Sequence, residues 1–400
     1  MPLVFRRHIL ERKKIQASCK ELINKKKREE KEMAITAAQV KELREASGAG
    51  MMECKKALTE ADGNMDAAIE ILKKSGAMKA AKKASRIAAE GLCDVAKTDD
   101  GKTAAVVEVN SETDFVAKNE KFKAFVGRVA AQALKSDAAD MEGFMAENWI
   151  DDESKTVKAE LEEMVLTIGE KLDIRRFKKV VSADGLVESY IHGGGKIAVI
   201  VEATGEDKAE IREAMKNIAM QVAAMNPQYV KREDISADEL AKMREIVVDS
   251  SINDPATLPK PILQKLIDKA IAEKKWSDED IAIYEEKKSN MNYLFNFLSK
   301  AAAPALAELG MAEKEAYLSD KIFTGLVEGR VSKQIKDVCL FEQVYVKAED
   351  GKQTVAKYVD QVAKANGGNF AIKSVVRFET GEGIEKKEEN FAEEVAKQMQ

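Results

Sequence analysis

The stretch that decides the fold is Val107-Glu-Val-Asn-Ser-Glu-Thr-Asp-Phe-Val116. Its β-branched residues predict a buried strand, which ends at Asn110-Ser111 because both residues favour turns and helix caps. Apolar side chains then recur at helical spacing from Phe122 to Val129, so a helix is expected to follow. Between strand and helix stand an acid and a large aromatic, Asp114 and Phe115. The aromatic is either a plug in the core or a contact residue for a partner.

An internal repeat favours one of these roles. Sliding the chain by 94 positions places Glu90-Gly-Leu92 on Asp184-Gly-Leu186, and the agreement continues through the glycine turn and the following strand. Each copy consists of a strand, a glycine turn, a strand and an amphipathic helix, which predicts a duplicated αβ unit. The second copy has Ala209 where the first has Phe115. Because a plug that the scaffold needs would be needed twice, Phe115 is predicted to be a contact residue.

Composition limits the classes of protein that fit. The chain has 400 residues, enough for two to four domains, and its net charge of −5 argues against a nucleic-acid coat. No apolar run approaches the ~20 residues of a membrane span, so no membrane partner is expected. Four widely spaced cysteines predict a reducing, cytoplasmic location, and only two histidines argue against a zinc site or a histidine-based triad. No cofactor is expected.

Residues 1–32 form a basic extension that differs from the rest of the chain. A matrix-targeting peptide would be basic but poor in acids, whereas this segment contains five glutamates, among them Glu21, Glu29, Glu30 and Glu32. A nucleic-acid-binding arm is an alternative. The preferred interpretation is an upstream segment translated by mistake, with the natural start at Met33. Lys, Arg and Glu can all be encoded by purine-rich codons, so the run Lys25–Glu32 directly before Met33 is what a translated ribosome-binding site would look like.

Residues 33–76 predict three short helices, the first capped by Thr36 and the last closed by Gly76. Such a small unit buries little, so it is expected to recognise something. Met51 and Met52 follow a Gly-Ala-Gly turn, where they are either an adaptable docking surface or core residues. The lysines and Arg86 that follow the unit predict a flexible basic linker.

The rest of the chain divides by pattern. Residues 77–182 are the first αβ subdomain, with a helix over 153–172 and a strand over 175–181, and residues 183–235 are the second. His192-Gly-Gly-Gly-Lys196 joins two strands, so it is a hairpin turn and not a phosphate loop, which would feed a helix.

A helical hairpin or small bundle is predicted over residues 236–336. Its aromatics are expected to be internal packing, and any exposed share would form a self-association surface. Residues 337–380 return to the second subdomain, and residues 381–400 form a charged module that needs a partner to order it. The aromatics are Trp276, Tyr284, Tyr293, Phe295 and Phe297, and the elements expected in the return are a strand Leu340–Val346, a helix Thr354–Ala365 and a strand Ala371–Phe378.

Several motifs together resemble bacterial elongation factor Ts, in collinear order from about residue 35 to the end. They are Val40-Lys-Glu-Leu-Arg44, Ser47-Gly-Ala-Gly-Met-Met52, Cys54-Lys-Lys-Ala-Leu58, Thr113-Asp-Phe-Val116, Ser189-Tyr-Ile-His-Gly193, and Arg377-Phe378 with Gly381-Glu-Gly-Ile-Glu-Lys386. The resemblance implies an α+β fold. Its parts would be an N-terminal three-helix UBA-like module, a core of two repeated αβ subdomains with antiparallel sheets, an inserted helical hairpin or bundle, and a C-terminal helical module.

The resemblance also implies a function. The family exchanges guanine nucleotide on elongation factor Tu and is not an enzyme in its own right. Arg44, Met51 and Met52 match positions that contact the partner's GTPase domain, and Thr113, Asp114, Phe115 and Val116 match the turn that enters beside its magnesium ion. The partner would be elongation factor Tu, in its GDP-bound and nucleotide-free forms, with no direct contact to nucleic acid.

Two features depart from the family. The helical region is longer than the family's short hairpin, by an insertion around Ile252–Leu318, and residues 1–32 have no counterpart. A homodimer through this region is one hypothesis. The alternative function is a ribosome- or chaperone-associated binding protein without exchange activity. A nucleotide-using enzyme is a third class, which would require a phosphate loop.

Overall fold

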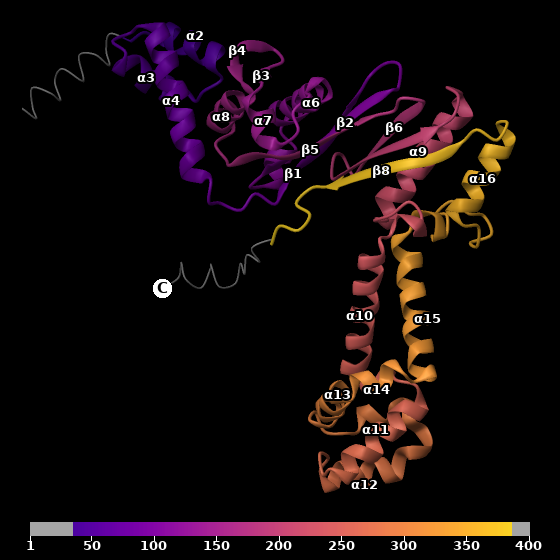
Figure 1. The fold of residues 1–400 in the computed structure, drawn as a ribbon. Coiled ribbons are helices and arrows are strands. Elements are labelled where there is room, and N and C mark those ends of the chain that lie inside the picture. Colours follow the sequence, from indigo (N-terminus) through magenta and orange to yellow (C-terminus); the bar gives the residue numbers. More distant parts are fainter. Residues whose placement is uncertain (1–34, 386–400) are drawn as a thin grey trace, which may run out of the picture. The chain divides into compact units, whose positions relative to one another are not determined.

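The computed structural model describes residues 35–385, so the predictions for 1–32 and 386–400 lie outside the described residues. The chain divides into two compact units, which are treated separately below. Unit 1 comprises the chain up to Ala223 together with the chain from Val375 onward, and unit 2 comprises Ala224–Ser374. Helices and small antiparallel sheets are combined (Figure 1), which agrees with the predicted α+β class.

Unit 1 opens with helices α2 (Ala37–Ser47), α3 (Met51–Glu60) and α4 (Met65–Lys83). Thr36 starts α2 through a capping box with Gln39, and Gly48 ends it in the left-handed conformation at φ 66°. Their buried residues form one small core, which includes Leu43, Cys54, Leu58 and Leu72. The three predicted helices are therefore confirmed.

The third helix is longer than predicted. Helix α4 runs through Gly76 to Lys83, so the expectation that Gly76 closes it is wrong, as is the flexible linker for the stretch up to Lys83. The reason is packing of α4 against helix α8 (Val157–Ile168). A Cβ at Gly76 would stand 3.1 Å from the carbonyl oxygen of Glu162, so glycine lets the two backbones approach closely.

The first αβ copy is built on a three-stranded antiparallel sheet. The strands are β1 (Glu90–Lys97), β2 (Thr103–Ser111) and β5 (Leu172–Val181), and β2 lies in the centre. Alternate residues of β2 face opposite ways: Val107 and Val109 belong to a core with helix α6 (Glu120–Lys135), whereas Ala104 and Val106 belong to a core with the second sheet. The deciding stretch is thus buried on both faces.

The second copy repeats the first at the predicted offset. Strands β6 (Gly185–His192) and β7 (Ile197–Thr204) form an antiparallel hairpin, confirming the turn over residues 193–196, and β8 (Ala371–Glu379) completes the sheet in the order β6-β7-β8. Gly91 and Gly185 are equivalent residues of the two copies. A Cβ at Gly91 would collide with the carbonyl oxygen of Val109, and one at Gly185 with that of Ala203. The repeat therefore preserves a close approach of two backbones that only glycine permits.

The helix predicted over 153–172 is shorter at both ends, since α8 runs over Val157–Ile168. Thr156 caps α8 by accepting the amide of Ala159, and Gly169 ends the helix at φ 85°. The residues before it form strand β4 (Asp152–Thr156), which pairs with β3 (Asn148–Trp149) after the short helix α7 (Met141–Ala146).

Unit 2 is helical, as predicted. Helix α9 (Ala209–Met225) leads into it, and α10 (Ala237–Asn253) and α15 (Lys321–Val338) run alongside each other (Figure 1). The intervening helices and the last helix pack into the same unit. They are α11 (Lys260–Ala272), α12 (Asp278–Lys287), α13 (Ala302–Ala312), α14 (Lys314–Leu318) and α16 (Val355–Ala365), with 3₁₀ turns at Arg232–Asp234, Pro255–Thr257, Lys288–Asn296 and Leu340–Glu342.

Two predictions for unit 2 need correction. Trp276 and Tyr284 are buried as expected, but Tyr293 and Phe297 are exposed, because the buried positions of the 3₁₀ segment Lys288–Asn296 are taken by Met291 and Leu294. The strand predicted over 340–346 is a 3₁₀ turn followed by one isolated bridge, from Val344 to Thr354. A strand requires a partner along its length, and here a single bridge is available.

Candidate functional site

The candidate site is centred on residues Thr113–Val116, called here the Phe115 turn. Thr113 caps the one-turn helix α5 (Asp114–Ala117), and its hydroxyl accepts the amide of Val116. Val116 is buried in the core, whereas the Phe115 side chain is 79% exposed. Asp114 forms an exposed ion pair of 2.6 Å with Lys118, whose ammonium also lies 5.9 Å from the Phe115 ring centroid. The turn therefore presents an aromatic ring beside a locally neutralised pair of charges.

The second copy shows how unusual this turn is. There α9 begins directly at Ala209, the residue equivalent to Phe115, and that residue is also exposed. In the first copy, Asn119 caps a new helix and separates α5 from α6. Phe115 therefore fills no core position in this fold, and the scaffold folds with alanine at the same place.

The helical module contributes a second set of exposed apolar residues. Met51 and Met52 begin α3 and are 59% and 74% exposed, so of the two roles the sequence left open, the structure supports the exposed one. Both follow the left-handed Gly48, which brings the turn against Thr167 at the end of α8: a Cβ at Gly48 would lie 3.1 Å from the Thr167 hydroxyl. Arg44 is exposed on the last turn of α2.

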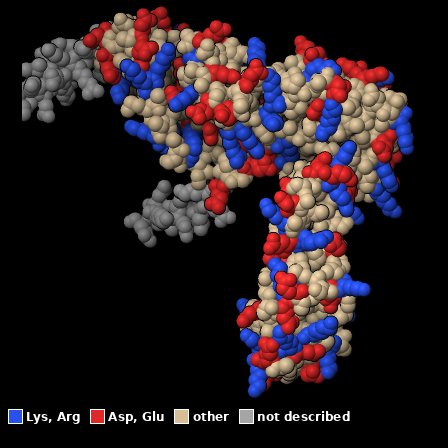
Figure 2. Space-filling model, in the orientation of Figure 1, with Lys and Arg blue, Asp and Glu red and all other residues tan. Residues whose placement is uncertain are grey.

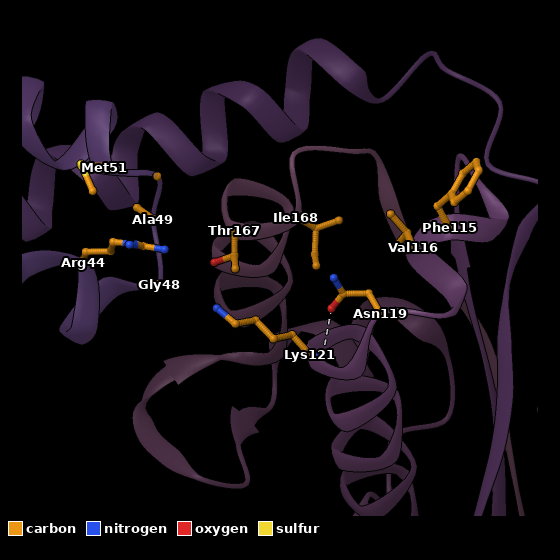
Figure 3. Close-up of a pocket in the computed structure, with 11 residues that line it drawn as sticks. Arg44, Gly48, Ala49, Met51, Phe115, Val116, Asn119, Lys121, Thr167 and Ile168 are labelled. Atoms are coloured by element: carbon orange, nitrogen blue, oxygen red, sulfur yellow. Dashed lines mark hydrogen bonds between the residues drawn. The ribbon is translucent and has the colours of Figure 1, made fainter. Parts of the chain in front are cut away.

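A groove of about 570 Å³ connects these two sets of residues within unit 1. Figure 3 shows Met51 at one end and Phe115 at the other, with the side chains of Arg44 and Lys121 directed into the space between them. Of the predicted site residues, Arg44, Met51, Phe115 and Val116 line this groove. The other lining residues are Gly48, Ala49, Gly50, Asn119, Lys121, Thr167 and Ile168.

Sequence reasoning missed the lining residues Asn119, Lys121, Thr167 and Ile168. The cap signal at Asn119 was visible, but Thr167 and Ile168 reach the groove only because α8 packs against α4. Met52, Thr113 and Asp114 do not line the groove. Met52 directly follows the lining residue Met51, and Thr113 and Asp114 form the base of the Phe115 turn.

Charge alone does not mark the site. On the face shown in Figure 2, acidic and basic side chains are interspersed over the described part of the chain. Among residues 35–385, no three His, Cys, Asp or Glu side chains are grouped so that they could hold a metal ion. None of the helices in the same range combines the length and apolar character that crossing a membrane requires. The large apolar side chains exposed at this site are Phe115, Met51 and Met52.

The site is thus a groove with exposed apolar side chains at both ends, the geometry that a partner-binding surface would need. Comparison with known proteins then identifies the family. The family model for "Elongation factor TS" matches residues 112–382. Elongation factor Ts of Clostridioides difficile is 44% identical over 366 residues, covering 91% of this chain and 99% of that protein.

Other relatives agree. Elongation factor Ts of Clostridium tetani is 41% identical, covering 92% of this chain and 100% of that protein, and that of Trichlorobacter lovleyi is 40% identical, covering 91% and 98%. The chain belongs to the elongation factor Ts family and is a translation elongation factor. The matches span nearly the whole of each relative.

Proposed function

We propose that the chain is a guanine-nucleotide exchange factor that acts on elongation factor Tu in the cytoplasm. The observation that carries the proposal is an aromatic side chain, Phe115, held 79% exposed on a capped turn at one end of a groove. An exposed aromatic that no scaffold requirement explains is typical of a contact residue. Met51 and Met52 supply adaptable apolar area at the other end, and Arg44 and Lys121 favour an acidic group between them.

Exchange follows from the chemistry of the partner's site. Nucleotide held by magnesium and charge-assisted contacts leaves slowly, because several contacts must break together. Phe115, inserted beside the magnesium ion, would stabilise the state in which those contacts are already lost. Its rigid ring suits this role because it buries area with little loss of side-chain freedom. Asp114 would bring its carboxylate close to the same phosphates and cation.

Turnover follows from linkage. If the factor weakens nucleotide binding, then nucleotide must weaken binding of the factor by the same ratio. GTP that enters the empty site therefore expels the exchange factor. No covalent step is needed, so the activity requires no catalytic residues of this chain.

The finer architecture belongs to the same proposal. Residues 33–76 would be a UBA-like docking module, residues 77–182 and 183–235 the two core subdomains, and residues 337–380 the return of the second subdomain. The C-terminal module, 381–400, would add a further contact with the partner. The exposed Tyr293 and Phe297 of the helical region are available for a homodimer contact, to be tested by sedimentation.

The test is stopped-flow release of a fluorescent GDP from elongation factor Tu of the same source. The full chain should accelerate release strongly, and Phe115→Ala should lose about 1–3 kcal/mol of transition-state stabilisation, or roughly 5- to 150-fold in rate. Ile246→Ala is a matched control, because Ile246 is also a large apolar residue, 64% exposed, but lies in unit 2. It should match the parent.

Two results would change the conclusion. If the parent accelerates release and Phe115→Ala equals it, exchange stands but the role of Phe115 is wrong. If neither accelerates release although both bind, the chain is a binding protein without exchange activity.

A further inference from the structure

Two glutamates form reciprocal bonds between the Phe115 turn and the start of β5. The carboxylate of Glu170 accepts the amide of Thr113 at 3.1 Å and its hydroxyl at 2.8 Å. In the opposite direction, the carboxylate of Glu112 accepts the amide of Lys171 at 2.5 Å. These bonds continue the β2–β5 pairing, whose last pair is Ser111 with Leu172, into the turn by means of side chains.

The bonds to Glu170 decide how Thr113 is used. Its hydroxyl donates to Glu170 and accepts the amide of Val116 at 3.5 Å, so both functions of the hydroxyl are occupied. A helix of four residues has no cooperative stability of its own and depends on its cap. The orientation of α5, and with it that of Phe115, therefore depends on Glu170 through Thr113.

The same connection also holds the end of the helical module. The ammonium of Lys171 donates to the carbonyl oxygens of Ala84 and Arg86, both at 2.8 Å, and Lys83 at the end of α4 donates to that of Gly169. Arg86 in turn pairs with Glu112 at 3.1 Å. Residues 169–171 thus bond both to the Phe115 turn and to residues 83–86, at the end of α4 and just after it.

We propose that Glu170 is a positioning residue for nucleotide exchange, acting by holding the Phe115 turn in its exposed conformation before the partner binds. The inference rests on the proposed function. A preformed turn avoids the ordering cost at the moment of insertion, so Glu170 should affect the rate of release more than the affinity for the partner. Because the module with Met51 and Met52 has its own core, the docking surface should remain intact without Glu170.

The kinetic test is a double-mutant cycle on the full chain. Glu170→Ala should lower the maximal rate of GDP release about tenfold, which corresponds to about 1.4 kcal/mol, with the half-saturating concentration changed less than about twofold. Glu170→Gln, which keeps one acceptor oxygen, should lose less. In the Phe115→Ala background, Glu170→Ala should cause no further loss, because the group it positions is gone. Glu153→Ala, an exposed glutamate on β4, is the control.

Hydrogen exchange separates this inference from the proposed function. In Glu170→Ala the amides of residues 113–118 should exchange at least about tenfold faster, whereas those of β2 should be unchanged, whether or not the chain accelerates GDP release. Unchanged hydrogen-exchange rates for the amides of residues 113–118 would overturn the positioning role. So would a release rate equal to that of the parent, or an equal loss in the Phe115→Ala background. A parent that fails to accelerate GDP release would refute the proposed function. The hydrogen-exchange rates of residues 113–118 would then decide alone whether Glu170 positions the Phe115 turn.

Discussion

Glu108 is a fully buried carboxylate on the central strand β2, and its neutralisation should destabilise unit 1. One oxygen accepts Arg175 at 3.0 Å, the amide of Gly381 at 2.8 Å and the amide group of Asn110 at 3.2 Å, and the other accepts Arg176 at 2.5 Å. Breaking a buried ion pair typically costs 3–5 kcal/mol. Here the arginines are 28% and 31% exposed and regain some hydration. Glu108→Gln should therefore cost about 2–3 kcal/mol, or about 4–12 °C in Tm for a unit of this size.

The two tryptophans make the assay specific for each unit. Trp149 is buried in unit 1 and Trp276 in unit 2, so in a Trp276→Phe background the fluorescence reports unit 1 alone. Urea unfolding of Glu108→Gln should then show the loss, and in a Trp149→Phe background the unit 2 transition should not move. Glu153→Gln, at an exposed position, is the matched control. A Glu108→Gln transition within about 0.5 kcal/mol of the parent would refute the reasoning, since surface substitutions fall in that range.

Three further predictions use the same probe or simple chemistry. Burial alone would raise the pKa of Glu188, but Lys97 and Arg212 bring it below the ordinary 4.5, so its stabilisation is present above that value and is lost as pH falls through the folded pKa. Glu188→Gln should thus cost about 1–2 kcal/mol at pH 7, with a cost that fades below about pH 4.5; a pH-independent difference contradicts the assignment. Burial raises the pKa of Cys93 to about 12, so its thiol should not react with a disulfide reagent at pH 8 until urea unfolds the chain. Mass spectrometry measures the labelling, and rapid labelling of the native chain would show that solvent reaches Cys93. Gly76→Val should destabilise unit 1 by about 1–3 kcal/mol in urea unfolding, because the added side chain meets the α8 backbone; unchanged stability would mean that α4 can move away.

Patterns that repeat locally could be predicted from the sequence. The two hairpins followed from the 94-residue repeat, and the comparison of Phe115 with Ala209 identified an aromatic that the structure leaves exposed. Helix α6 followed from its apolar spacing, because the same face that carries Phe122 and Phe125 packs against the sheet.

What could not be predicted depends on contacts between distant segments. Gly76 has the sequence signature of a helix end, but α4 continues past it to Lys83 because it packs closely against α8. Arg175 is the extra residue of a β-bulge: Glu108 pairs with Arg176 and Val109 with Ile174. The bulge directs two successive arginines at one carboxylate, which strict strand alternation would forbid. For the same reason Thr167 and Ile168 carried no signal as groove residues.

The order of strands in the second sheet affects how the chain is made. Strand β8 pairs with β7, but nearly the whole of unit 2 is encoded between these two strands. At ~5–20 residues per second, synthesis of these roughly 150 residues takes about 8–30 s. Until β8 leaves the ribosome, one edge of β7 has no partner strand. Glu108 on β2 likewise lacks the hydrogen bond that the amide of Gly381 donates to it in the folded protein. Unit 1 is therefore expected to be the last part of the nascent chain to resist proteolysis, although most of it is synthesised first.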